Sequence, residues 1–197
     1  MNYLILTPDG VGSTILQRIL TMNLYLENVK VKNTHELLNG LSIVDGVAEK
    51  KWDPKYGQSL QEIKKILNES SPSTTLVSRM AKYHIDIRKD NNKDQKMFYD
   101  FLNQTYDYII MCERKNIFEY AMSWSIRIKS GVLNVYNKED RDKVLSVDSV
   151  DEEQFLKKCK EYVAYTYWVE ENFPKVNKVT YEDMLTNSDD VLYKISG

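Results

Sequence analysis

The sequence predicts an α/β protein with three layers, in which helices flank a mainly parallel sheet. Short apolar runs alternate along the 197 residues with segments whose apolar residues recur at helical spacing. This alternation is the pattern of strand–helix–strand units. Candidate ligand-binding residues follow directly after three of the predicted strands. Because ligands of parallel sheets bind at the carboxyl ends of strands, we expect a site at that edge.

Each element is predicted from its own local pattern. Residues 3–6 are apolar and precede a Pro-Asp-Gly turn, as expected of a buried strand. Ser13 or Thr14 begins the next helix, whose apolar residues lie on one face. Gly131 ends a later helix, and Asp151 caps a long one. We expect strands at residues 3–6, 29–31, 74–83, 108–112 and 176–181, and further helices at 34–41, 59–68, 93–104, 116–129, 151–172 and 189–195.

The composition favours one cytoplasmic domain over residues 1–197, with residues 131–150 as an exposed loop because they are charged and lack periodicity. A net charge of -2 argues against nucleic acid as a partner. No apolar run reaches the roughly 18 residues of a membrane span. Cys112 and Cys159 are expected to be buried thiols in a reducing compartment. Since Cys, His and acidic residues do not cluster, no metal is expected.

A glycine-containing turn, TPDGVGST at positions 7–14, is the first candidate site for an anion. Gly10 and Gly12 permit positive φ angles and a close approach of the backbone to a ligand. The amides and the dipole at the start of the next helix favour an anion there, and Ser13 and Thr14 add hydroxyl donors. The turn predicts a P-loop-like nucleotide-binding architecture, with an ordinary strand–helix turn as the alternative.

The same turn argues against a kinase that uses ATP. The phosphate loop of such enzymes contains Gly-Lys-Ser/Thr, with the lysine reaching the phosphates. Here Ser13 follows Gly12 directly, and no lysine occurs from Asn2 to Asn28. A P-loop-type nucleotide kinase is therefore the less favoured alternative.

The segment TPDGVGSTIL at positions 7–16 resembles the turn of sulfotransferases that use 3′-phosphoadenosine 5′-phosphosulfate, especially their short bacterial and phage forms. In that family a Pro-Lys/Arg-Ser-Gly-Thr-Thr/Ser turn between a strand and a helix holds the 5′-phosphosulfate. Gly10 stands where the family has Lys or Arg. Arg18, one turn into the helix, is the candidate replacement, with an ordinary surface arginine as the alternative. The resemblance assigns the cofactor to Gly10, Val11, Gly12, Ser13, Thr14 and Arg18.

The segment IMCERKNIFEYAMS at positions 110–123 resembles a second block of the family. There an arginine after a strand, and a serine about eight residues later, hold the 3′-phosphate. The resemblance assigns this role to Arg114 and Ser123, with Lys115 as the alternative to Arg114. A guanidinium offers phosphate two parallel donors, which an ammonium cannot.

The segment AKYHI at positions 81–85 resembles the family's Lys-Thr-His-Leu, whose histidine is the general base. The resemblance assigns the base to His84, and Lys82 would neutralise charge on the transferring oxygens. An imidazole titrates near neutral pH, which suits the removal of a proton from an acceptor hydroxyl. A fourth segment, VTYEDML at positions 179–185, resembles a strand end of the family and is expected to be structural.

The resemblance implies a sulfotransferase that moves a sulfuryl group from 3′-phosphoadenosine 5′-phosphosulfate to an acceptor hydroxyl and leaves adenosine 3′,5′-bisphosphate. The expected acceptor is a small molecule or a carbohydrate. The departure at Gly10 keeps a second hypothesis open, a module that binds adenosine 3′,5′-bisphosphate without turnover. The family's later basic, glycine-containing segment has no visible counterpart before Gly197, so either this is a C-terminally short form of the domain or the chain is truncated.

Overall fold

The computed structural model describes residues 1–8, 10–36, 41–44, 47–50, 67, 73–82, 92–132 and 135–196. They divide into two compact units, which we describe separately. The first unit consists of Met1–Glu113 and Trp168–Gly197, and the second of Arg114–Tyr167. The first unit contains the sheet, and the second is helical where it is described.

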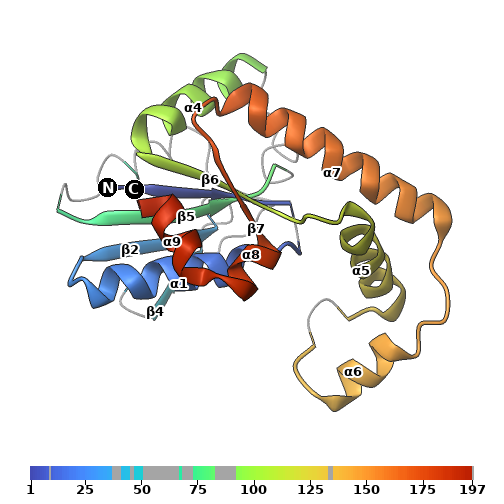
Figure 1. Ribbon diagram of the computed structural model, residues 1–197. Helices are drawn as coiled ribbons and strands as arrows, with labels where there is room; N and C mark the ends of the chain where they lie inside the picture. The colour runs from blue at the N-terminus through green and yellow to red at the C-terminus, as the bar shows by residue number, and fades with distance from the viewer. Residues whose placement is uncertain are drawn as a thin grey trace. The chain divides into compact units, whose positions relative to one another are not determined.

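A seven-stranded sheet forms the first unit in the part of the chain that the structure describes (Figure 1). Its order is β4-β3-β2-β5-β1-β6-β7. From β2 to β7 all neighbours are parallel, whereas β3 and β4 add an antiparallel extension at one edge. The predicted α/β class with a mainly parallel sheet is confirmed. The strands are β1 (Tyr3–Leu6), β2 (Val31–Glu36), β3 (Leu41–Val44), β4 (Val47–Lys50), β5 (Thr75–Met80), β6 (Tyr108–Glu113) and β7 (Asn177–Thr180).

Helices cover both faces of this sheet. Figure 1 shows α4 over one face and α1 over the other, and α1 contacts β1, β2 and β5. This arrangement gives the predicted three layers. The helices of the first unit are α1 (Ser13–Leu26), α4 (Asn92–Thr105), α8 (Tyr181–Thr186) and α9 (Ser188–Ser196). Those of the second are α5 (Ile117–Ser130) and α6 (Lys138–Leu145), and α7 (Glu152–Asn172) has residues in both units.

The middle of the sheet is buried on both of its faces, as is typical of parallel strands covered by helices. All four residues of β1 and all six of β5 are buried. In the register of the sheet, Leu6 lies beside Met80 of β5 and Met111 of β6. The carboxyl ends of these three strands therefore lie at one edge, where the residues after each strand leave the sheet.

The predicted helix over residues 34–41 is wrong. Residues 34–36 belong to β2, and residue 41 begins β3. Val31, Lys32 and Asn33 pair with β5 in parallel, and Glu36 pairs with Leu41. Pairing with a strand distant in sequence therefore outweighs a weak local helical pattern. The predicted helix over 59–68 lies outside the described residues except for Leu67, which is helical and buried.

In the second unit, the predicted helix at residues 116–129 is confirmed as α5, and the structure contains a helix that was not predicted, α6. Asn116 caps α5 by accepting from the amides of Phe118 and Glu119, and Gly131 ends it with φ 71°. The segment expected as a loop over 131–150 contains α6, which the prediction missed. Asn137 caps α6 by accepting from the amide of Asp140. No residue of α6 is buried, so it has no apolar face by which its sequence could be identified.

Two predicted strands end earlier in the structure than the sequence indicated. Strand β5 ends at Met80 rather than at residue 83. Strand β7 ends at Thr180, whose hydroxyl accepts from the amide of Asp183 at 3.1 Å and caps α8. Tyr181 therefore begins a helix instead of ending a strand, because the cap competes with continued pairing.

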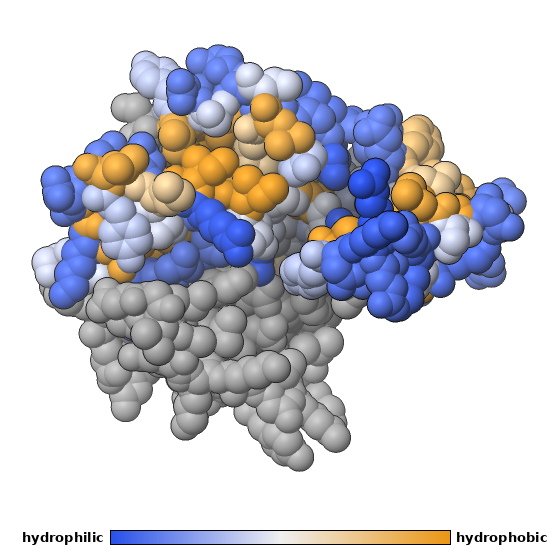
Figure 2. Space-filling view, turned by 90° about the horizontal axis from the view of Figure 1, so that it is seen from below, coloured by the Kyte–Doolittle hydropathy of each residue, from blue (hydrophilic) through white to orange (hydrophobic). Residues whose placement is uncertain are grey.

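The surface in the described residues mixes apolar and charged side chains, as Figure 2 shows from below. On α1 the exposed large hydrophobic side chains are those of Ile15, Met22, Tyr25 and Leu26. No helix in the described part of the chain is both long and apolar enough to cross a membrane. Cys112 is buried as expected, whereas Cys159 is partly exposed, contrary to the prediction.

Candidate functional site

The glycine-containing turn lies at the carboxyl end of β1, the strand between β5 and β6. Thr7 is buried, and its amide donates to the carbonyl of Met80 at 3.1 Å, which joins the start of the turn to the end of β5. Gly10 and Gly12 have φ angles of 81° and 85°. A side chain at either position would be strained, so the turn requires both glycines.

The turn ends at the N-terminus of α1. Gly12 is the residue before the helix, and its carbonyl accepts from the amide of Ile15 at 2.9 Å. The amides of Ser13 and Thr14 precede that bond and have no partner within the helix. Ser13 begins α1, as predicted, and no side chain caps the helix. These two amides face the region before the helix, where the dipole favours an anion.

A buried arginine of β5 contacts the hydroxyls of this turn. Arg79 is 8% exposed. Its Nη1 donates to Oγ of Ser13 at 3.4 Å and also to Oγ1 of Thr14. Sequence reasoning missed Arg79, although a charged residue among the apolar residues of a predicted buried strand is an unusual signal. Arg18, the candidate that the sequence offered, is exposed.

Two further elements of the first unit pack against the turn. A Cβ atom on Gly12 would lie 2.3 Å from Cδ2 of Tyr181, so the ring of Tyr181 rests directly against the glycine. The thiol of Cys112 in β6 donates to the carbonyl of Val11 at 3.2 Å. The backbone of the turn is thus fixed from α8 on one side and from β6 on another.

Of the two predicted catalytic residues, Lys82 and His84, the structure describes only Lys82. His84 lies outside the described residues. Lys82 follows β5 by two residues and is partly exposed. Its Nζ lies 5.9 Å from the ring centroid of Trp168. Trp168 in turn packs edge-on against Tyr99 and Phe173, so an aromatic cluster supports the lysine stem.

The residues predicted for the 3′-phosphate belong to the second unit. Arg114 directly follows β6 and is partly exposed, and Lys115 beside it is exposed. The amide of Arg114 donates to the hydroxyl of Tyr162 at 2.8 Å, and this hydroxyl donates back to the Arg114 carbonyl at 3.3 Å. Tyr162 of α7 therefore holds the backbone at Arg114.

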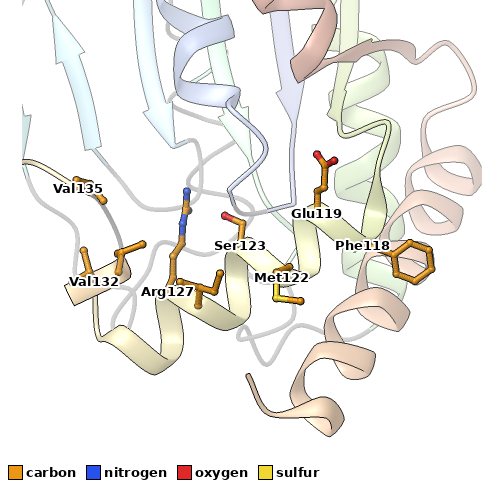
Figure 3. A pocket seen from close by; sticks show the side chains of 9 residues that line it. Phe118, Glu119, Met122, Ser123, Arg127, Val132 and Val135 are labelled. Carbon is orange, nitrogen blue, oxygen red and sulfur yellow. The ribbon is translucent and has the colours of Figure 1, made fainter. Parts of the chain in front are cut away.

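Ser123 lines a cavity of about 710 Å³ within the second unit (Figure 3). Figure 3 shows Ser123 and Arg127 on the same side of α5, one helical turn apart. The rest of the lining is mostly apolar and comprises Phe118, Glu119, Met122, Ile126, Val132, Val135 and Val144. The sequence analysis did not include Arg127, although its spacing of four residues from Ser123 on a predicted helix indicates a shared face.

Glu113, the last residue of β6, has a raised pKa. Burial of its carboxyl group is the largest cause, and the nearby carboxylates of Glu170 and Glu182 raise the pKa further. Lys178 acts in the opposite direction. The ionised form of Glu113 is thus disfavoured in the folded state relative to the unfolded chain.

Glu113→Gln is expected to stabilise the fold at pH 7 more than at pH 4. A carboxyl group whose pKa is raised on folding contributes stability below its ordinary value of 4.5, and loses that contribution as the pH rises through the folded value. Glutamine cannot ionise and avoids the loss. Urea unfolding of wild type and variant at both pH values measures the difference. Glu171→Gln, at an exposed position of α7, is the control, and a benefit for Glu113→Gln that is equal at both pH values would contradict the prediction.

The fold and the turn define an α/β protein whose central strand leads through a glycine-containing turn into a helix, an arrangement typical of nucleotide-binding sheets. In the described residues, no group of three or more His, Cys, Asp or Glu could hold a metal ion. The sequence matches no family model and no curated protein.

Several solved structures are similar to the chain. Retinol dehydratase in complex with retinol and PAP matches at 14% identity and a TM-score of 0.47. Its complex with androsterone and the inactive cofactor PAP matches at 12% identity and a TM-score of 0.44. Each match covers 99% of this chain, which spans 58% of the retinol dehydratase chain. An apo GTPase from Pyrococcus abyssi matches at 12% identity and a TM-score of 0.34, covering 100% of this chain and 97% of the other. Likenesses at these levels assign neither family nor activity.

Proposed function

We propose that the protein is a sulfotransferase that uses 3′-phosphoadenosine 5′-phosphosulfate. The observation that carries the proposal is the turn at the end of β1. It joins two glycines with positive φ, the N-terminal amides of α1, and the hydroxyls of Ser13 and Thr14. Each of these groups either donates a hydrogen bond or lets the backbone approach the ligand closely, as a bound phosphosulfate requires.

Each end of the cofactor has its own set of residues in this proposal. The turn from Gly10 to Thr14 binds the 5′-phosphosulfate through amides and hydroxyls. Arg114 and Ser123 bind the 3′-phosphate, because a guanidinium and a hydroxyl are strong donors to its oxygens. The proposal rests on the resemblance of the segments at positions 7–16 and 110–123, together with the donor set at the turn.

The proposed acceptor carries a hydroxyl group. When bound, the cofactor supplies a sulfuryl group whose bond to the 5′-phosphate breaks as the acceptor oxygen bonds to sulfur, which gives a sulfate ester and adenosine 3′,5′-bisphosphate. His84 takes the acceptor's proton. Lys82 is a cation two residues before it and balances the negative charge on the transferring oxygens.

A second candidate function is the binding of adenosine 3′,5′-bisphosphate without turnover. The observation that favours it is Gly10, which occupies the position where the resembling family has Lys or Arg. Such a module would need the donors of the turn but no general base, so the two candidates differ in catalysis and not in nucleotide preference.

A nucleotide competition followed by a transfer assay separates these functions. In a thermal-shift experiment, adenosine 3′,5′-bisphosphate is expected to raise the melting temperature, because a ligand that binds only the folded state stabilises it. ATP with magnesium is the comparison, and a larger shift with ATP would reject the proposal in favour of a kinase. Binding followed by sulfate transfer to a panel of phenols, alcohols and sugars supports the enzyme, whereas binding without transfer to any of them supports the module.

Arg114→Ala is expected to weaken the binding of adenosine 3′,5′-bisphosphate about 10- to 100-fold, the effect of losing one hydrogen bond to a charged group. Affinity for adenosine 5′-phosphosulfate, which has no 3′-phosphate, should be unchanged. Calorimetric titration of both ligands measures the difference. Lys115→Ala is the matched control, and a loss seen there instead would move the 3′-phosphate contact to Lys115. An equal loss for both nucleotides would contradict a role at the 3′-phosphate.

A further inference from the structure

The turn of this protein lacks the cation that the resembling family carries there, and the structure shows a cation arriving from another strand. Position 10 is glycine. Arg79 of β5 lies beside Ile5 of β1 in the parallel register, so it enters from the neighbouring strand. Its guanidinium contacts the hydroxyls of Ser13 and Thr14 at the first turn of α1.

The position of this charge is electrostatically unusual. The N-terminus of a helix carries a partial positive charge, so a buried cation beside it is repelled. The first turn of α1 itself contains no acidic residue. A bound anion would reverse the sign of the interaction for both the helix end and the guanidinium. Both the helix end and the guanidinium would therefore attract an anion bound at this place.

The chemistry of the contact leaves the hydroxyls able to act as donors. A hydroxyl accepts through its oxygen lone pairs and donates through its own hydrogen. Because Ser13 and Thr14 accept from Nη1 of Arg79, their hydrogens are directed away from the arginine. Burial and these two hydrogen bonds restrict the position of the guanidinium, and Arg79 has at least one further interaction in the fold. The hydroxyls and the amides beside them thus form a donor set polarised by a fixed positive charge.

We propose that Arg79 is the cation of the anion site, and that it binds and orients the 5′-phosphosulfate end of the nucleotide in place of a lysine or arginine within the turn. The proposal rests on the proposed function for the identity of the nucleotide, but not for the existence of the anion site. In this proposal Arg79 takes the role that the resemblance assigned to Arg18, because Arg79 is buried at the hydroxyls whereas Arg18 is exposed on α1.

The test uses the full chain, two substitutions of Arg79 and one control. Arg79→Met keeps the apolar stem and removes the charge, Arg79→Lys keeps the charge and removes the planar group, and Arg18→Met is the control. The probes are inorganic pyrophosphate, adenosine 5′-phosphate and adenosine 3′-phosphate, each titrated by calorimetry. Circular dichroism and the melting temperature without ligand establish which variants are folded.

Arg79→Met should weaken the binding of pyrophosphate and of adenosine 5′-phosphate about 10- to 100-fold, the usual effect of losing a charge-assisted hydrogen bond. The affinity for adenosine 3′-phosphate should change less than twofold, because this nucleotide has no 5′-phosphate that the turn could bind. The affinities of Arg79→Lys should lie between those of wild type and Arg79→Met. Arg18→Met should bind all three ligands like wild type. A purely structural role for Arg79 would instead change all three affinities together.

Two results would overturn the proposal. One is a folded Arg79→Met that binds pyrophosphate like wild type; should this variant not fold, unchanged binding by Arg79→Lys has the same meaning. The other is a wild type that does not bind pyrophosphate.

Failure of the proposed function gives a different result. If pyrophosphate binding depends on Arg79 while adenosine 3′,5′-bisphosphate does not bind, the anion site is supported and the proposed identity of the nucleotide is rejected. If adenosine 3′,5′-bisphosphate binds equally well to wild type and to the Arg79 variants, the identity of the nucleotide is supported and the proposed role of Arg79 is rejected.

Discussion

Gly12→Ala is expected to lower the free energy of unfolding by about 2–4 kcal/mol, the sum of backbone strain and overpacking. The φ angle of 85° at this position is costly for any residue with a Cβ atom. The added methyl group would also lie 2.3 Å from Cδ2 and 2.8 Å from Cε2 of the Tyr181 ring, far inside contact distance. The ring or the turn must move, so nucleotide binding should fall together with stability. Urea unfolding and calorimetric titration measure the two effects.

Gly131→Ala is a matched control for the strain alone. Gly131 has a φ angle of 71° at the end of α5, but a Cβ atom there meets nothing within 4 Å in the described residues. Its expected loss is about 1 kcal/mol. Combining Gly12→Ala with Tyr181→Ala should restore part of the stability that Gly12→Ala loses, because the clash is then removed. Equal losses for the two glycines, without any such coupling, would show that Tyr181 does not restrict Gly12.

His84→Ala is expected to reduce the turnover number for sulfate transfer about 100- to 10,000-fold, the usual contribution of a positioned general base. The affinity for adenosine 3′,5′-bisphosphate should change little, since the base acts on the acceptor. Steady-state kinetics and titration of the same preparation measure both quantities. The matched control is His35→Ala, which changes the chain's other histidine, a residue of β2.

The pH dependence gives a second measurement of the role of His84. A base must be unprotonated to take a proton, so wild-type turnover should rise with pH through the titration of the histidine. The variant should lose this rise and retain a low, nearly constant rate. A variant that keeps both the wild-type rate and the wild-type pH profile would remove His84 as the base. A variant that loses nucleotide binding as well would show a structural role.

The sequence predicted the elements whose patterns are local and missed the features that depend on distant parts of the chain. The runs at residues 3–6 and 108–112 became β1 and β6, because buried parallel strands are apolar on both faces. The antiparallel extension of β3 and β4 was missed, since strand pairing is decided by partners and not by the run itself.

The candidate site shows the same division. The turn and its two glycines were visible in the sequence, because a strand, a turn and a helix are consecutive. Arg79 was not identified, because only the register between β1 and β5 places it beside Ser13 and Thr14. The functional roles of Arg114, Ser123, Lys82 and His84 remain predictions, and the experiments above address those of Arg114 and His84.

The order of the strands also has a consequence for how the chain folds. In the register of β1, Tyr3 lies beside Val77 on one side and beside Tyr108 on the other. Both neighbours of β1 therefore lie more than 70 residues further along the chain. Parallel pairings between such distant segments form slowly, because a long loop must close before any contact is gained. The glycine-containing turn is thus set by neighbouring residues, whereas its contact with β5 depends on a slow pairing between distant segments.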